Sequence, residues 1–201
     1  MRKTIALLLL ILLPSLLFAG FFGMQAGFDF SYLDLKVKRN GSTKFQQEEL
    51  WLSVPLALSL EYTSEYTGIG AGLEVTFEKM LFKEVDGYDY DLRSDSLRFS
   101  TATIYVLDVE RYGKNYLEYG AGISYSRLTL NPESSVSDAS RIGLVTKFEF
   151  CNMLNNPIVL KYGIRIGTPV LTFADEHYRY RSIADDGFSL QAYVSIGIGD
   201  S

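Results

Sequence analysis

His177 is the single histidine of this 201-residue chain, and its imidazole is the side chain best suited to acid–base chemistry near neutral pH. It lies in the stretch DEHYRYRS, where Glu176 directly precedes it and Ser182 follows five residues later. A serine, a histidine and a carboxylate can form a nucleophilic triad. These three share one polar stretch without the spacing of a rigid element, so we expect a surface-loop histidine rather than a catalytic one.

Four aspartates in the stretch EVDGYDYDLRSD could offer oxygen ligands to calcium: Asp86, Asp89, Asp91 and Asp95. The stretch lacks the spacing and the twelfth-position glutamate of an EF-hand loop. We therefore expect solvated carboxylates, with no metal site and no cofactor. The single cysteine, Cys151, excludes an intramolecular disulfide and any cysteine-rich metal site.

Tyrosine alternates with charge in YDYDLR and in HYRYR, a composition favoured at protein recognition surfaces. These stretches are therefore the candidates for binding a protein or another surface ligand. The candidate residues are Tyr88, Tyr90, Arg93, His177, Tyr178, Arg179 and Tyr180.

A larger set of ionisable residues recurs at every second position of apolar segments. In residues 50–62, LWLSVPLALSLEY, even positions are large and apolar, whereas most odd positions are small or polar. A period of two is typical of a strand with one apolar face. The charged residues on the polar faces of this and similar segments are Glu61, Glu74, Glu78, Arg98, Asp108, Glu118, Lys147, Glu149, Lys161 and Arg165. Inside a narrow barrel they should pair into a plug, or alternatively line a gated, ion-selective pore.

Seven further segments alternate in the same way: 23–32, 68–78, 96–110, 116–127, 141–151, 158–167 and 187–199. In 96–110 we expect Tyr105 and Leu107 outside and Asp108 inside. After Tyr32 the apolar residues change phase, which predicts a bulge or a strand extension, and Pro55 predicts a bulge or a lost ladder bond. Short connections alternate with longer polar ones, the arrangement of an outer-membrane β-barrel.

The ends and the composition agree with export to a membrane. Residues 1–19 have the layout of a signal peptide, with cleavage expected after Ala19 or Gly20 and a barrel domain over 20–201. Removing Arg2 and Lys3 changes the net charge from −5 to −7, which argues against a nucleic-acid partner. A membrane protein without long apolar helices must close its strands into a barrel, because lipid cannot hydrate an unpaired backbone.

A soluble lipocalin-type barrel, with its apolar face turned inward to a ligand, is the alternative fold. The opposite faces carry several glycines, among them Gly68, Gly70, Gly72, Gly120 and Gly122. So many glycines would make a poor water-facing surface, but they suit a narrow lumen. We therefore expect the leucines of 50–62 to face lipid and its serines to face the interior.

With eight alternating segments and connections sorted by length, the chain resembles the small outer-membrane barrels of the OmpX/OmpA/OmpW-like superfamily. The resemblance implies an all-β, eight-stranded antiparallel up-and-down barrel in the bacterial outer membrane. We expect a monomer with both termini periplasmic, in contact with outer-membrane lipids and the outer-membrane assembly machinery. Loops 79–95 and 173–186 would bind an extracellular protein or surface ligand. The alternatives are a small channel or conduit and, more distantly, a lipid-modifying enzyme using His177.

Overall fold

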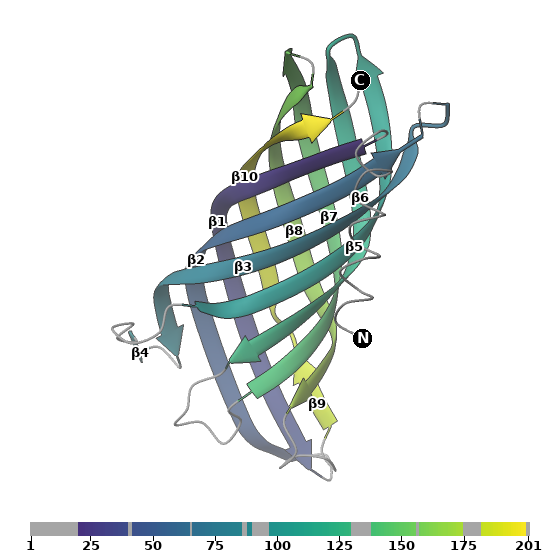
Figure 1. The fold of residues 1–201 in the computed structure, drawn as a ribbon. Helices are drawn as coiled ribbons and strands as arrows, with labels where there is room; N and C mark the ends of the chain where they lie inside the picture. Colours follow the sequence, from purple (N-terminus) through teal and green to yellow (C-terminus); the bar gives the residue numbers. More distant parts are fainter. Residues whose placement is uncertain are drawn as a thin grey trace, which may run out of the picture.

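A computed structural model describes residues 20–39, 42–64, 66–85, 88–89, 97–129, 138–155, 157–174 and 182–199, so the predicted signal peptide lies outside the described residues. Eight long strands form a barrel (Figure 1). They are β1 (Gly20–Arg39), β2 (Ser42–Thr63), β3 (Ile69–Val85), β5 (Leu97–Tyr112), β6 (Asn115–Thr129), β7 (Asp138–Asn155), β8 (Ile158–Ala174) and β10 (Phe188–Gly199). No helix in the described part of the chain is long and apolar enough to cross a membrane.

Antiparallel pairing joins each long strand to the next, and the first strand to the last. The closing ladder runs from Phe21 opposite Gly199 to Tyr32 opposite Phe188. Two short strands extend this framework: β4 (Tyr88–Asp89) pairs with the end of β3, and β9 (Ser182–Asp185) pairs with β1. The predicted eight-stranded antiparallel barrel is therefore confirmed.

The two ends of the barrel differ in their connections. At one end β2–β3, β5–β6 and β7–β8 are joined within a few residues, and Gly113 turns with a φ of +67°. We call this the turn end; it is uppermost in Figure 1, whereas β4 and β9 lie at the opposite end, the loop end. Both the start of β1 and the finish of β10 lie at the turn end.

The leucine-rich face of β2 points outward. Leu56 is 57% exposed and Leu58 is 45% exposed, whereas Ser53 and Ser59 are buried inside the barrel. The same division holds along β7, where Leu144 is exposed and Lys147 is buried. The lipocalin-type alternative is therefore wrong, because the apolar side chains cover the outside of the cylinder and do not line a cavity.

Strand β5 is oriented opposite to the sequence prediction. Tyr105 and Leu107 are buried inside the barrel, whereas Ile104, Val106 and Asp108 are exposed on its outside. Hence the expectation that Asp108 faces the lumen is wrong. The cause is weak contrast between the two faces, since residues 104–107 are apolar or aromatic at every position.

Two irregularities in the sequence have simple structural counterparts. Leu33 and Leu35 continue the inward face of β1 with no exposure at all, so the phase change after Tyr32 marks a strand extension. Its pairing with β2 is regular up to Val37, and the register shifts between Val37 and Lys38. In the β1–β2 ladder, Gly27 and Phe28 are not paired with the Val54–Pro55 segment opposite them. Proline has no amide hydrogen to donate, so the expected loss of ladder bonding occurs there.

Candidate functional site

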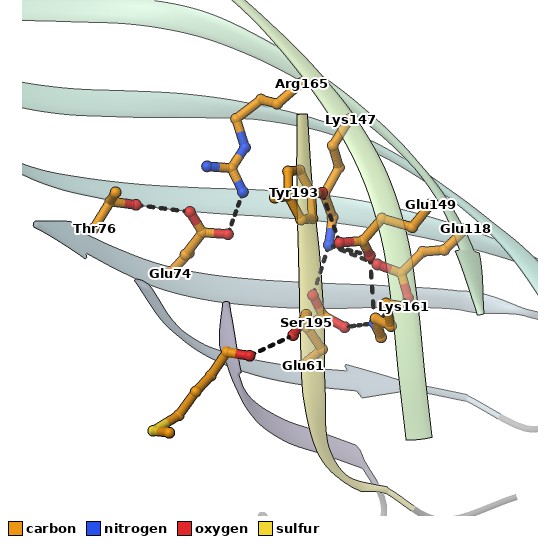
Figure 2. Close-up of polar contacts among 11 residues, drawn as sticks. Glu61, Glu74, Thr76, Glu118, Lys147, Glu149, Lys161, Arg165, Tyr193 and Ser195 are labelled. Atoms are coloured by element: carbon orange, nitrogen blue, oxygen red, sulfur yellow. Dashed lines mark hydrogen bonds and ion pairs between the residues drawn. The ribbon is translucent and has the colours of Figure 1, made fainter. Parts of the chain in front are cut away.

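Five buried residues form one cluster of ion pairs inside the barrel (Figure 2). The Lys147 Nζ lies 2.6 Å from Glu61, 2.6 Å from Glu118 and 3.0 Å from Glu149. The Lys161 Nζ contacts the same three carboxylates: it is bonded to Glu61 and lies 3.0 Å from Glu118 and 3.4 Å from Glu149. We call these residues the five-residue cluster.

The strands bring these charges together from distant parts of the sequence. Glu61 comes from β2, Glu118 from β6, Lys147 and Glu149 from β7, and Lys161 from β8. Glu118 lies opposite Glu149 in the β6–β7 ladder, so their side chains project from the same face. Gly120 makes room for Lys147, since a Cβ at position 120 would lie 2.6 Å from its Cγ.

Aromatic rings surround the two lysines. Tyr193 donates a hydrogen bond of 2.6 Å to Glu149, and the Lys147 ammonium lies 5.0 Å from the centroid of the Tyr105 ring. The Lys161 ammonium lies 4.2 Å from the Phe21 ring. These contacts add cation–π attraction to the ion pairs in a site sheltered from water.

A second polar group lies beside the first, toward the loop end. Arg165 donates to Glu74 and, over 2.8 Å, to Gln191, while Thr76 donates to Glu74 over 2.8 Å. The Arg165 guanidinium lies 5.0 Å from the centroid of the Tyr193 ring, and the hydroxyl of this tyrosine donates to Glu149 of the five-residue cluster. Together the two groups fill the middle of the barrel with paired charges.

Two cavities flank these groups, and no described residue lines both of them. The cavity at the turn end has a volume of about 280 Å³ and is lined by Phe21, Tyr116 and Lys161, among others. The cavity on the loop side has about 70 Å³ and includes Asp29, Glu78 and Arg165 in its lining. The barrel therefore holds two separate spaces with paired charges between them.

Neither a protein-family model nor a curated protein matches the chain. Among solved structures, the crystal structure of Neisserial surface protein A (NspA) aligns with a TM-score of 0.55 and 13% identity, covering 89% of this chain and 97% of NspA. The chain has the fold of an outer-membrane β-barrel.

Two further structures align less closely. Ail, the attachment invasion locus protein of Yersinia pestis, has a TM-score of 0.44 at 12% identity, over 90% of this chain and 98% of its own. The outer membrane protease OmpT from Escherichia coli has a TM-score of 0.47 at 6% identity, over 88% of this chain and 96% of OmpT. At 13% identity the similarity to NspA concerns the fold alone. No conclusion about this chain is drawn from the alignments with Ail and OmpT, whose TM-scores are below 0.5.

Most of the charges expected in the lumen of the barrel do lie inside it. They are Glu61, Glu74, Glu78, Glu118, Lys147, Glu149, Lys161 and Arg165. Asp108 is the exception on the outer face, and the side chain of Arg98 in β5 lies outside what the structure describes. Asp29 is missing from the predicted set, although its alternation with Phe28 and Phe30 is the signal that places it inside.

The candidate loop residues Tyr90, Arg93, His177, Tyr178, Arg179 and Tyr180 lie outside the described residues. The backbone of Tyr88 belongs to β4 and pairs with Val85, whereas its side chain lies outside what the structure describes. Among the described residues, one group has metal-type ligands close together: Glu118, Glu149 and Cys151. Both carboxylates there already hold lysine ammonium groups, and Cys151 packs against Phe21 and Val159.

A further set of polar contacts, centred on Asp185, fixes the loop end and does not follow from the sequence pattern. Asp185 of β9 accepts hydrogen bonds from Arg141 at 2.9 and 3.0 Å and from Thr172 at 2.8 Å. Nearby, Lys36 donates to Asp34, and this hydrogen bond raises the pKa of the Lys36 ammonium above its usual value. Strand β9 also pairs with β1, and the Asp186 N–H donates to the Asp34 carbonyl over 3.1 Å, so the end of the 173–186 connection is tied to three strands of the barrel, β1, β7 and β8.

Proposed function

We propose that the chain is an integral barrel of the bacterial outer membrane, a filled scaffold that presents binding segments at its loop end. Large apolar side chains such as Met24, Leu58 and Ile123 are exposed around the outside of the strands. In water this surface would be unfavourable and prone to association. Hydrocarbon tails are its natural surroundings, and closure of the barrel leaves no unpaired edge in lipid.

The observation that carries the scaffold role is the five-residue cluster. Its lysines and carboxylates are almost wholly buried, and they lie between the two cavities. An eight-stranded barrel is barely wide enough for its own inward side chains. The filled interior favours a structural plug over an open solute pore.

The loop end supports a binding role, because its segments start and finish on paired strands. Residues 79–85 are the end of β3, and β4 pairs back onto that end, whereas residues 173–174 end β8 and the connection returns through β9 to β10. We place the tyrosine- and arginine-rich stretches of these segments outside the cell, where an extracellular protein or surface ligand would bind. In this proposal the termini are periplasmic, the assembly machinery inserts the chain, and the barrel acts as a monomer without catalytic activity.

Planar-bilayer recording of refolded residues 20–201 tests the plug, and protease treatment of intact cells tests the orientation. We expect no unitary openings, together with cleavage within 79–95 and 173–186. Steady openings that Lys147→Glu or Arg165→Glu abolishes would instead establish a channel. Loops protected from external protease would contradict the proposed orientation.

A conduit for small solutes is the second candidate, and the two cavities favour it. The turn-end cavity of about 280 Å³ could hold a small molecule beside Phe21, Tyr116 and Met153. Passage to the loop side would require the ion pairs of Lys147 to separate, because the two cavities share no described lining residue. The same bilayer recording distinguishes this candidate from the plugged scaffold.

A further inference from the structure

The cavity on the loop side has a lining unlike that of the rest of the interior. It is rich in hydroxyl groups, which come from eight serine and threonine residues, among them Ser31, Thr76 and Thr101. Two carboxylates, Asp29 and Glu78, and two guanidinium groups, Arg141 and Arg165, complete its ionisable lining among the described residues. We call it the Asp29–Glu78 cavity.

Both guanidinium groups are already matched by other carboxylates. Arg165 is paired with Glu74, and Arg141 is paired with Asp185 at the loop end. Asp29 and Glu78 have no ion pair among the described residues. Each accepts a hydrogen bond from one hydroxyl group, Asp29 from Ser31 at 2.8 Å and Glu78 from Ser53 at 2.9 Å.

One oxygen of this pair is both buried and unpartnered. Asp29 is 4% exposed, and its Oδ1 has no hydrogen-bond donor in the described part of the barrel. A buried, charged carboxylate oxygen without a partner is strongly unfavourable, so a proton, a water molecule or a cation has to satisfy it. The Nε2 of Gln191 and the Nε of Arg165 also lack acceptors among the described residues, and both residues belong to the same lining.

We propose that the Asp29–Glu78 cavity binds one divalent cation, with calcium the best fit. Two unpaired carboxylates balance one such ion, and carboxylate and hydroxyl oxygens are the ligands that hard cations prefer. A cavity of about 70 Å³ has room for an ion with about one water, since one water occupies about 30 Å³ in the liquid. Calcium accepts irregular sets of six to eight oxygens, whereas magnesium requires near-octahedral geometry.

The position of the cavity gives the ion a mechanical role. Asp29 comes from β1 and Glu78 from β3, so an ion between them links the two strands that flank β2. Glu78 lies opposite Pro55, and the β1–β2 ladder is interrupted where Gly27 and Phe28 face Val54 and Pro55. The cation would hold the wall of the barrel together beside this interruption.

Titration calorimetry of refolded residues 20–201, stripped with EDTA in a zwitterionic detergent, tests the proposal with calcium chloride. We expect one site per chain, and a dissociation constant raised about tenfold or more by Asp29→Asn and by Glu78→Gln. Glu110→Gln is the matched control, because Glu110 is exposed at the turn end and should leave the affinity unchanged. No calcium binding, or equal binding by all variants, would overturn the proposal and leave protons as the balancing charge.

A measurement on the unaltered chain keeps the test decisive if the variants do not fold. Trp51 is the single tryptophan of the chain and lines the same cavity. Terbium bound there should show emission sensitised by Trp51, and calcium should displace it more effectively than magnesium does. Sensitised emission that calcium leaves unchanged would count against the site. Both experiments are independent of the loop-end binding proposed above.

Discussion

At the scale of single residues, Lys161 carries much of the charge balance inside the barrel. It contacts three carboxylates of the five-residue cluster and is 1% exposed. Lys161→Met leaves Glu61, Glu118 and Glu149 facing Lys147 alone. Breaking a buried ion pair by removing one partner costs about 3–5 kcal/mol, so the free energy of unfolding should fall by about that amount.

Urea unfolding in lipid vesicles, followed by the fluorescence of Trp51, measures this loss. Lys114→Met is the matched control, because Lys114 is exposed in the turn between β5 and β6 and should change stability little. Equal unfolding curves for the two variants would show that the cluster contributes no net stability.

Gly163 is required by the ring of Tyr193, its partner across the β8–β10 ladder. A Cβ at position 163 would overlap this ring and lie 2.6 Å from its hydroxyl, which donates to Glu149. Gly163→Ala should therefore lower the free energy of unfolding by about 1–3 kcal/mol, the usual cost of overpacking. In a Tyr193→Ala background the same substitution should cost almost nothing, and a double-mutant cycle measures the difference. An equal cost in both backgrounds would assign the effect to the backbone and not to the ring.

At the scale of elements, the accuracy of the sequence prediction depended on the contrast between the two faces of each strand. In β2, large leucines alternate with serine and alanine, so both the strand and its orientation follow from the period of two. In β5 the run Ile104–Tyr105–Val106–Leu107 has no polar face, and its orientation follows only from pairing, with Glu74 opposite Thr103. A single sequence does not contain that information.

The site shows the same limit. Alternation identifies which charged residues face the interior, as it does for Lys147 and Glu149. It does not identify which charges meet across the barrel, since Glu61 and Lys161 are 100 residues apart and approach through the shape of the whole sheet. The hydrogen bond from Tyr193 to Glu149 does not follow from the sequence, because an inward tyrosine in a strand is usually a packing residue.

Strand β9 depends on Asp185, and this dependence can be measured directly. Asp185→Ala removes the acceptor of the hydrogen bonds from Arg141 and Thr172. Hydrogen bonds to charged groups contribute about 1.5–3 kcal/mol each, so the β9 amides that bond to β1 should lose protection from hydrogen exchange by about tenfold or more. The amides of β6, remote from this anchor, should keep their protection.

Asp186→Ala is the control for this experiment. The Asp186 side chain is mostly exposed, and its ion pair with Lys36 is long, at 3.4 Å. Exposed ion pairs of this kind contribute little, so exchange in β9 should remain close to that of the unaltered chain. If both variants exchange alike, Asp185 is not the anchor of this strand.

At the scale of the whole molecule, the barrel is apolar outside and charged inside, the reverse of a soluble domain. Apart from the pair of Arg141 and Asp185, the described interior side chains include six carboxylates, from Asp29, Glu61, Glu74, Glu78, Glu118 and Glu149, against the cations Lys147, Lys161 and Arg165. This excess of acid is located at the Asp29–Glu78 cavity and in the five-residue cluster. A chain arranged in this way needs lipid around it, and the proposed cation would balance part of the acid within it.

The need for lipid leads to a prediction on the outer face. Ile123 is 60% exposed near the middle of β6, which the proposed orientation places near the midplane of the bilayer. An arginine on the lipid face at the bilayer midplane costs about 2–4 kcal/mol, so Ile123→Arg should lower the free energy of unfolding in vesicles by about that amount. Tyr66→Arg is the control, because Tyr66 is 98% exposed in the turn between β2 and β3, where water surrounds it. If the two arginines were tolerated equally in vesicles, hydrocarbon would not be what covers the middle of this barrel, since only an apolar medium makes the position of the charge matter.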